Sequence, residues 1–427
     1  MPSTQQTNFP TPSNQKLSQQ TPKTTLFSQR PRLVASLWAV VLVLVNLLVG
    51  CDTPQATANQ QNQPTREERI ISAVEKRIFL DLSLEFLDNY ELPQQTFQDT
   101  PIGGLSSIIY DRQRNLFYAL SDDASALAPA RFYTLNLTLN SPAPNQTKIE
   151  NIEIQKLTTL HTETGETFPR YSINPEGIAL ASPNEIFISS EGISNLSIDP
   201  FVQKFDLNTG RWLQTIPIPN RYLTNQNNET PAKGVQNNLG FEALTVKANI
   251  GEPSRLFTAT EAPLEQDKEP VDSKIVQKNR FLHYLLGDGQ PILISEHFYP
   301  LDRGPKWSIA NGLTELLVLD QGGHFLSLER SIGFLGYGAK IFQIATGSAT
   351  DTSGIPSLKG ELKSIEPIKK KLLLDLSTIG IYLDNLEGMT FGPRLPDGSQ
   401  SLILVSDNNF DENQVTQFLL FRLKTGI

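Results

Sequence analysis

Short runs of alternating apolar and polar residues dominate the chain from about residue 77 onward. Five of these runs open with one pattern: a small or acidic residue, Gly or Ala, an aliphatic residue, then Ser, Thr or Ala. The copies are Gly103–Ser106, Glu176–Ala179, Glu242–Thr245, Asn311–Thr314 and Glu387–Thr390. They recur about every 70 residues, and a fixed spacing of this kind is typical of an architecture built by repetition of one unit.

Further apolar runs follow each copy. A second run ends in an acidic residue, and the second runs are Leu116–Asp122, Ile186–Glu191, Leu256–Glu261, Phe325–Glu329 and Leu402–Asp407. The third runs are Arg131–Leu137, Phe201–Leu207, Arg280–Leu285, Lys340–Ile344 and Gln417–Leu423. Fourth runs follow the first four copies, at Ile149–Leu157, Trp212–Ile218, Pro291–Phe298 and Ile368–Leu376. A period of two bounded by turn residues indicates strands, so each repeat predicts a four-stranded antiparallel blade.

The pattern therefore predicts an all-β fold, a β-propeller of five blades, with a sixth, degenerate blade left open. The fifth copy lacks a fourth run because the sequence ends at Ile427. The run Ile78–Leu87 precedes the first copy and has no other partner. We expect it to supply the missing outer strand and close the ring. A β-sandwich with a second domain is the main alternative, but it would not explain five copies.

The N-terminal segment has the pattern of an export signal. Its only charges before the apolar run Leu33–Gly50 are positive, and Cys51 follows that run directly. Leu48–Cys51 resembles the lipobox of bacterial lipoproteins, and Cys51 is the single cysteine of the chain. The alternative is an uncleaved transmembrane anchor. Either interpretation exports the rest of the chain, and we expect acylated Cys51 to hold the protein in membrane lipid on the periplasmic or cell-surface side.

Composition divides the chain into three parts. Residues 1–50 form the signal or anchor segment, residues 51–76 the lipidation site and a polar tether, and residues 77–427 the propeller. The formal net charge of −9 argues against nucleic acid or anionic lipid as partners for the folded part. We expect the folded part to be a monomer.

Repetition should gather acidic residues at one end of the propeller, because strand one begins where strand two ends. Strand-one starts supply Glu176, Glu242 and Glu387, and strand-two ends supply Asp122, Glu191, Glu261, Glu329 and Asp407. Strand three begins at the same end and brings three bases, Arg131, Arg280 and Lys340. Converging carboxylates repel one another unless a cation or a base compensates them.

Two interpretations of this acidic face stay open. Oxygen ligands suit Ca²⁺ or Mg²⁺, so the strand-two acids, together with Asn409 in the polar segment after Asp407, are candidate metal ligands. Glu176, Glu242, Glu387 and the three bases are then candidate catalytic residues. Alternatively, the acids pair with Arg131, Arg280 and Lys340 or cap strand ends. The sequence has no Gly-x-Ser-x-Gly elbow, and its four histidines lack metal-ligand spacing.

These motifs resemble, in order and wording, the phytase-like family described by the esterase-like activity of phytase. The matching segments are Gly103–Ser106 with Tyr118–Asp122, Pro175–Ala179 with Ser189–Glu191, Gly240–Leu244 with Thr260–Glu261, Leu326–Arg330, and Asp384–Met389 with Ser406–Phe410. The resemblance covers roughly residues 77–425.

The resemblance implies hydrolysis of an ester, including a phosphate monoester, by an exported propeller. By analogy with calcium-dependent phytases, which are a separate family, carboxylate-bound cations would polarise the ester and activate a water. Arg131, Arg280 or Lys340 would then bind a small anionic ester. Two alternatives remain: a non-catalytic cell-surface propeller that binds a ligand or protein, and a calcium-dependent propeller similar to lactonases.

Overall fold

A computed structural model describes most of the chain after the N-terminal segment. The described residues are 75, 77–143, 146–224, 232–249, 252–270, 273–287, 289–319 and 323–426. The predicted signal Leu33–Gly50, the lipidation site Cys51 and the tether to residue 74 lie outside them. Among the residues that are described, no helix has the length and apolar character needed to cross a membrane.

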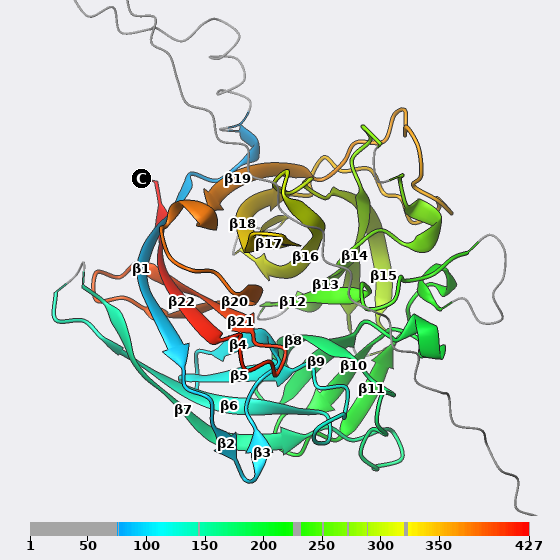
Figure 1. The fold of residues 1–427 in the computed structure, drawn as a ribbon. Helices are drawn as coiled ribbons and strands as arrows, with labels where there is room; N and C mark the ends of the chain where they lie inside the picture. Colours follow the sequence, from blue (N-terminus) through cyan, green and yellow to red (C-terminus); the bar gives the residue numbers. More distant parts are fainter. Residues whose placement is uncertain are drawn as a thin grey trace, which may run out of the picture. The chain divides into compact units, whose positions relative to one another are not determined.

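Five four-stranded antiparallel sheets form the molecule, as the repeats predicted (Figure 1). The first blade consists of β4 Leu105–Asp111, β5 Leu116–Ser121, β6 Arg131–Asn140 and β7 Lys148–Thr159, and the second of β8 Pro175–Ser182, β9 Glu185–Ser190, β10 Phe201–Asp206 and β11 Trp212–Ile216. The third blade consists of β12 Phe241–Asn249, β13 Glu252–Thr260, β14 Lys278–Leu286 and β15 Ile292–Pro300. The fourth consists of β16 Ser308–Val318, β17 His324–Gly333, β18 Gly336–Ala345 and β19 Lys369–Asp375. The fifth combines β20 Asn385–Arg394, β21 Gln400–Asp407 and β22 Thr416–Thr425 with the N-terminal strand β1 Leu82–Leu92.

Minor elements lie between the blades. A short hairpin joins β1 to β4, and four 3-10 helices occupy connections. They are β2 Thr96–Phe97, β3 Thr100–Pro101, η1 Ser194–Leu196, η2 Asn220–Tyr222, η3 Glu265–Asp267 and η4 Leu376–Thr378.

The N-terminal strand closes the ring, which confirms the closure inferred from the unpaired apolar run. β1 pairs antiparallel with β22, from Leu82 opposite Thr425 to Leu92 opposite Thr416. Figure 1 shows this blue strand beside the red C-terminal one. The strand extends five residues beyond the predicted end at Leu87 and begins later, because the pairing with β22 and not the apolar pattern alone sets its limits.

The hydrophobic core lies between the blades. Five clusters of buried side chains occur, one at each junction of neighbouring blades. The cluster between the fifth and first blades, for example, packs Leu105 and Phe117 against Val405 and Phe418. The first strand of each blade also contacts the first strands of both its neighbours, which completes the ring around the central channel. Five blades, with no sixth, account for the described propeller.

Every first strand carries a β-bulge at the same place. The bulges begin directly after Leu105, Pro175, Phe241, Leu313 and Leu386, which lie opposite Ser121, Ser190, Thr260, Glu329 and Ser406. A bulge bends its strand and re-aims one side chain. This repeated irregularity therefore defines equivalent positions around the channel mouth, independently of the sequence pattern.

Candidate functional site

Two circles of side chains surround the channel mouth, which is the end where strand one begins and strand two ends. The residue after each bulge start forms the inner circle: Ser106, Glu176, Glu242, Thr314 and Glu387. The residue that follows each opposing position in strand two forms the outer circle: Asp122, Glu191, Glu261, Arg330 and Asp407. Seven carboxylates thus share the mouth with one guanidinium.

The register corrects the repeat alignment in two blades. Ser106 and Thr314, not Gly103 and Asn311, are the equivalents of the three inner glutamates. In the fourth blade, Arg330 occupies the position of the strand-two acid, and Glu329 occupies the Ser/Thr position before it. The sequence pattern places Glu329 at the acid position because the second run Phe325–Glu329 ends in this acid.

Glu329 accordingly lies outside the mouth. Its carboxylate accepts a hydrogen bond of 2.6 Å from the Tyr299 hydroxyl and pairs with the Lys370 ammonium. The Asp302 backbone N–H also donates to it, at 3.1 Å. These contacts make Glu329 an anchor for the fourth blade and leave the predicted metal-ligand role to its neighbours.

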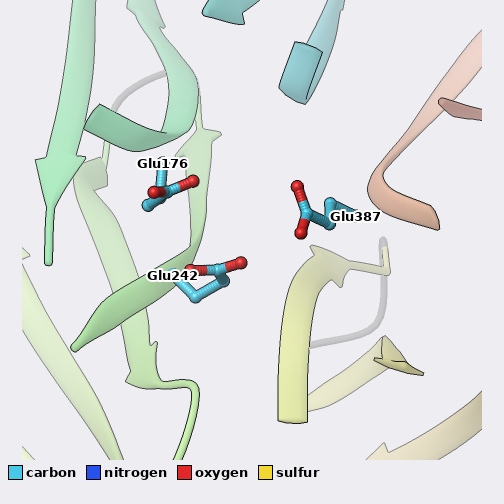
Figure 2. Close-up of side chains that lie close together, drawn as sticks. All are labelled: Glu176, Glu242 and Glu387. Atoms are coloured by element: carbon cyan, nitrogen blue, oxygen red, sulfur yellow. The ribbon is translucent and has the colours of Figure 1, made fainter. Parts of the chain in front are cut away.

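The inner glutamates converge on one point. Carboxylate oxygens of Glu176, Glu242 and Glu387 all lie within 4.8 Å of one another, and the three residues are only 5–6% exposed. In Figure 2 these carboxylates face a common space, with Glu387 opposite the other two. Glu242 also belongs to a second group with Glu191 and Glu261, again within 4.8 Å. The structure therefore brings together five of the predicted site residues around a shared carboxylate.

Arg330 is the base that sequence reasoning missed. Its guanidinium lies 2.8 Å from Glu387 and also contacts the Glu261 carboxylate, while 18% of its side chain stays exposed. It donates a 2.6 Å hydrogen bond to the side-chain amide oxygen (Oδ1) of Asn385. Within the described part of the chain, no basic side chain pairs with Glu176. The only available signal was that Arg330 directly follows the presumed acid, Glu329.

Burial and mutual repulsion hold protons on these carboxyls. Burial raises the pKa of Glu176, Glu242 and Glu387 well above the usual range, and neighbouring carboxylates raise the pKa of each further. Burial together with Glu261 raises the pKa of Glu191 to about 8, although the Gly240 N–H opposes the shift. Without a compensating cation, burial and mutual repulsion therefore favour the protonated forms of these four glutamates.

The outer circle contains a group with a smaller shift. Burial raises the pKa of Asp407 to about 6, and the Asn409 backbone N–H, 2.7 Å from its carboxylate, limits the rise. Burial and the Asp407 charge raise the pKa of Asp122 well above its usual range. Burial lowers the pKa of Arg330, but Glu261, Glu387 and Glu242 outweigh it and raise that pKa.

A further buried carboxyl, Glu315, follows the inner-circle residue Thr314. Glu315 of β16 accepts a 2.7 Å hydrogen bond from the Ser107 hydroxyl of β4, on a blade that is not its neighbour. The Leu316 N–H donates to it as well, at 2.9 Å. Burial raises its pKa to about 8. The hydrogen bond between Glu315 and Ser107 therefore links the first strands of two blades that are not neighbours.

The three predicted bases pair with other acids. Arg131 is bound to Asp123 at 2.6 Å, and Lys340 to Asp302 at 2.7 Å. Arg280 is fully buried between two carboxylates, those of Asp267 and Glu296. None of these ion pairs involves a carboxylate of the mouth, so the alternative in which the three bases neutralise the repeated acids does not describe this structure.

The loop after Asp407 contributes through its backbone. The Asn409 side chain is exposed and donates to Gln414 at 3.2 Å, away from the carboxylates. The neighbouring Asn408 instead accepts a 2.9 Å hydrogen bond from the Gly104 N–H. Gly104 has φ +61°, and a Cβ there would lie 2.1 Å from an Asp122 oxygen. This close approach requires glycine.

The potential metal ligands at the mouth are all carboxylate oxygens. Their combined negative charge exceeds the single positive charge of Arg330. Hard divalent cations such as Ca²⁺ and Mg²⁺ prefer such donors. Glu176, Glu242 and Glu387 could hold one cation, and Glu191, Glu242 and Glu261 could hold another beside it. The residues present therefore fit the cation that the sequence predicted.

Comparison with known proteins identifies the family. The model of the phytase-like family, described as "Esterase-like activity of phytase", matches residues 100–410 and confirms the resemblance drawn from the motifs. No curated protein matches the sequence.

Solved structures with a similar fold include a thermostable family-43 glycoside hydrolase, at 10% identity and TM-score 0.39, covering 79% of this chain and 93% of that one. Others are an endo-arabinase from Bacteroides thetaiotaomicron and the catalytic domain of a GH62 α-L-arabinofuranosidase from Coprinopsis cinerea. Each is 10% identical with TM-score 0.38, covering 80% of this chain and 97% of its own.

Proposed function

The chain belongs to the phytase-like family with esterase-like activity, and from this premise we propose that it is a cation-dependent hydrolase of small anionic esters, including phosphate monoesters. The observation that carries the proposal is the convergence of Glu176, Glu242 and Glu387 within 4.8 Å at the channel mouth. A buried group of this charge is costly unless a cation binds there or protons neutralise it.

A divalent cation, Ca²⁺ or Mg²⁺, held by these glutamates would polarise the ester and lower the pKa of water. The chain itself supplies the remaining functions. Arg330 keeps 18% of its side chain exposed at the mouth, and Arg is well suited to bind phosphate or carboxylate through two parallel hydrogen bonds. Its ties to Glu261 and Glu387 fix the guanidinium beside the cation ligands.

Asp407 is the best-placed group to move a proton. Its pKa of about 6 allows it to be deprotonated near neutral pH while still accepting a proton readily. The Asn385 amide lies 3.5 Å from its carboxylate and also donates to Glu387 at 2.9 Å. Asn385 thereby orients both carboxylates. We assign Asp407 the role of general base.

We propose further that the propeller works outside the cytoplasm, held in a bacterial membrane by acylated Cys51. The support is the order of basic residues, the apolar run Leu33–Gly50 and the lone cysteine. The folded part starts at about residue 77, so some 25 residues, most of them polar, would separate it from the lipid.

The test is hydrolysis of aryl phosphate and aryl acetate esters by the purified protein, with calcium, with magnesium and with chelator. We expect activity with one cation and its loss in chelator. Glu242→Gln should abolish the cation-dependent rate, because Glu242 belongs to both carboxylate groups. Glu412→Gln is the matched control, since Glu412 is an exposed acid on the loop beside the mouth.

Two results would overturn this function. Full activity in chelator would show that hydrolysis does not depend on a divalent cation. Absence of hydrolysis with every cation, in a protein that still binds calcium, would instead favour the non-catalytic, ligand-binding propeller.

A further inference from the structure

The five first strands that carry the inner circle belong to five separate sheets. Within the described chain, β4, β8, β12, β16 and β20 each form ladder hydrogen bonds only with the second strand of their own blade. Backbone pairing therefore fixes each strand within its blade but not the distance from one blade to the next. The spacing of Glu176, Glu242 and Glu387, which come from three different blades, must depend on other contacts.

The Glu315 side chain makes contacts of this kind. It is only 2% exposed, and its Oε1 accepts hydrogen bonds from the Leu316 N–H in its own strand, at 2.9 Å, and from the Leu244 N–H of β12, at 3.3 Å. Its Oε2 accepts a 2.7 Å hydrogen bond from the Ser107 hydroxyl of β4. Met389 of β20 supplies a further backbone hydrogen bond. One carboxylate therefore joins four of the five first strands.

Ser107 extends these contacts to the fifth strand. Its hydroxyl oxygen accepts a 3.4 Å hydrogen bond from the Ile178 N–H of β8. The backbone groups bound by Glu315 and Ser107 share one place in the repeat, two residues after the inner circle: Ile178 follows Glu176, Leu244 follows Glu242, Leu316 follows Thr314 and Met389 follows Glu387. Two residues of extended chain span only about 7 Å, so contacts that fix these N–H groups also fix the inner glutamates.

Glu315 is also the one large side chain at its position in the repeat. The residues directly after the inner circle in the other blades are Ser107, Gly177, Ala243 and Gly388. A Cβ at Gly388 would lie 3.0 Å from the Ser107 Cα, and one at Gly177 would lie 2.6 Å from the Glu242 carbonyl oxygen, because neighbouring first strands approach closely there. Glu315 departs from this pattern, and the departure supplies the acceptor for the other strands.

We propose that Glu315 is a positioning residue that sets the spacing of the three inner glutamates and gives the proposed site a preference for Ca²⁺ over Mg²⁺. This inference rests on the proposed function, because it requires a cation at the mouth. Hydrogen-bond donors occupy both oxygens of Glu315, so it acts through the strands and not as a ligand. Ca²⁺ takes more oxygen ligands than Mg²⁺, which binds through fewer carboxylates and keeps several waters. The convergence of all three glutamates should therefore matter more for Ca²⁺.

The experiment uses residues 64–427, which form a compact unit of their own containing the closing strand and all five interface clusters. Dissociation constants for calcium and for magnesium are measured by titration calorimetry. Glu315→Leu removes both acceptor oxygens. Loss of a residue that orients metal ligands typically weakens metal binding about 10–100-fold. We expect the calcium affinity to fall about tenfold or more and the magnesium affinity to fall less, so that the preference for calcium decreases.

Glu315→Gln is the matched variant. Its amide oxygen can accept the hydrogen bonds of Leu244 and Leu316, and its amide nitrogen can donate to the Ser107 hydroxyl oxygen in place of Oε2. Both variants lack the carboxylate charge, so the difference between them isolates the hydrogen bonds. We expect Glu315→Gln to bind calcium within about threefold of the wild type.

Two further variants separate positioning from stability. Ile152→Ala opens a cavity on the outermost strand of the first blade, where Ile152 is 4% exposed, and should lower the melting temperature without changing the calcium affinity. Ser107→Ala removes a single hydroxyl and should fold even if Glu315→Leu does not. It separates β4 and β8 from the Glu315 carboxylate, and should weaken calcium binding to a smaller extent than Glu315→Leu.

The results that would contradict this role differ from those that would contradict the proposed function. An unchanged calcium affinity in Glu315→Leu or, if that variant does not fold, in Ser107→Ala would overturn the positioning role and leave the proposed function intact. Equal losses in Glu315→Leu and Glu315→Gln would assign the effect to charge, and equal losses of calcium and magnesium affinity would refute the preference. A wild-type protein that binds neither cation would instead remove the cation from the proposed function, and this role with it.

Discussion

In the absence of divalent cations, the free energy of unfolding of the propeller should decrease as the pH rises from about 6.5 to 8. Burial raises the pKa of Glu191 and of Glu315 to about 8 in the folded state, from about 4.5 for a free glutamate. Between these values the folded protein holds protons that the unfolded chain has released. Stability is thus fully present at low pH and is lost as the pH rises toward 8.

The magnitude follows from the proton difference. One group contributes about 1.4 kcal/mol per pH unit, so these two together contribute about 3 kcal/mol per unit. For a domain of this size that is about 4 °C in melting temperature per pH unit. The inner glutamates, whose pKa values are also raised, add to the loss. His283 acts in the opposite direction, but burial lowers its pKa to about 4, so its effect ends near pH 6.5.

Calorimetric scans of residues 64–427 across this pH range, in chelator and in calcium, measure the effect. Calcium at a hundredfold excess over its dissociation constant should add about 2.7 kcal/mol to the free energy of unfolding. Its gain should be largest near pH 8, where fewer protons compete for the carboxylates. Glu191→Gln should reduce the slope in chelator by about 1.4 kcal/mol per unit, whereas Glu412→Gln should leave it unchanged.

A melting temperature in chelator that is flat or rises between pH 6.5 and 8 would refute this reasoning. It would mean that the buried carboxylates are already compensated by Arg330 and the backbone donors. A wild-type melting temperature indifferent to both calcium and magnesium would remove the cation from the proposed site.

Three further predictions concern other parts of the chain. Arg330→Gln should raise KM for an aryl phosphate about tenfold or more and affect a neutral aryl acetate much less, since loss of a charge-assisted pair weakens binding of the anion; equal effects on both substrates would exclude anion binding. Deleting Leu82–Leu92 should abolish the cooperative unfolding transition, whereas deleting residues 52–70 should not; a folded product of the first deletion would contradict closure by β1. Cys51→Ser should eliminate metabolic labelling by a fatty acid, and unchanged labelling would exclude this lipidation site.

The architecture was accessible from sequence because its signals are local. Each strand is indicated by apolar residues that alternate with polar ones, and the same set of runs recurs about every 70 residues. The closing strand was also inferable, because Ile78–Leu87 had no other partner. Its limits were not, since pairing with β22 and a register shift between Phe86 and Asp88 determine them.

The site was accessible only in part, because it depends on contacts between blades. Topology places the repeated acids at one end, and the structure brings Glu176, Glu242 and Glu387 together there. No spacing in the sequence reveals that Arg131 and Arg280 form ion pairs with acids of their own blades, Asp123 and Asp267. Arginines at strand-three starts look alike in sequence whether they face the channel or the blade interior.

Arg330 shows how a one-residue shift alters the chemistry inferred for a site. The pattern at Leu328-Glu329-Arg330 places Glu329 at the mouth, but the bulge after Leu313 sets Glu329 opposite that residue and carries Arg330 to the acid position. Because side chains alternate along a strand, this shift exchanges a carboxylate facing the channel for a guanidinium. A ring of eight acids would repel an anionic substrate in the absence of metal. In the proposed function, Arg330 places one guanidinium among the seven acids of the mouth, and this group would favour a phosphate ester over a neutral ester.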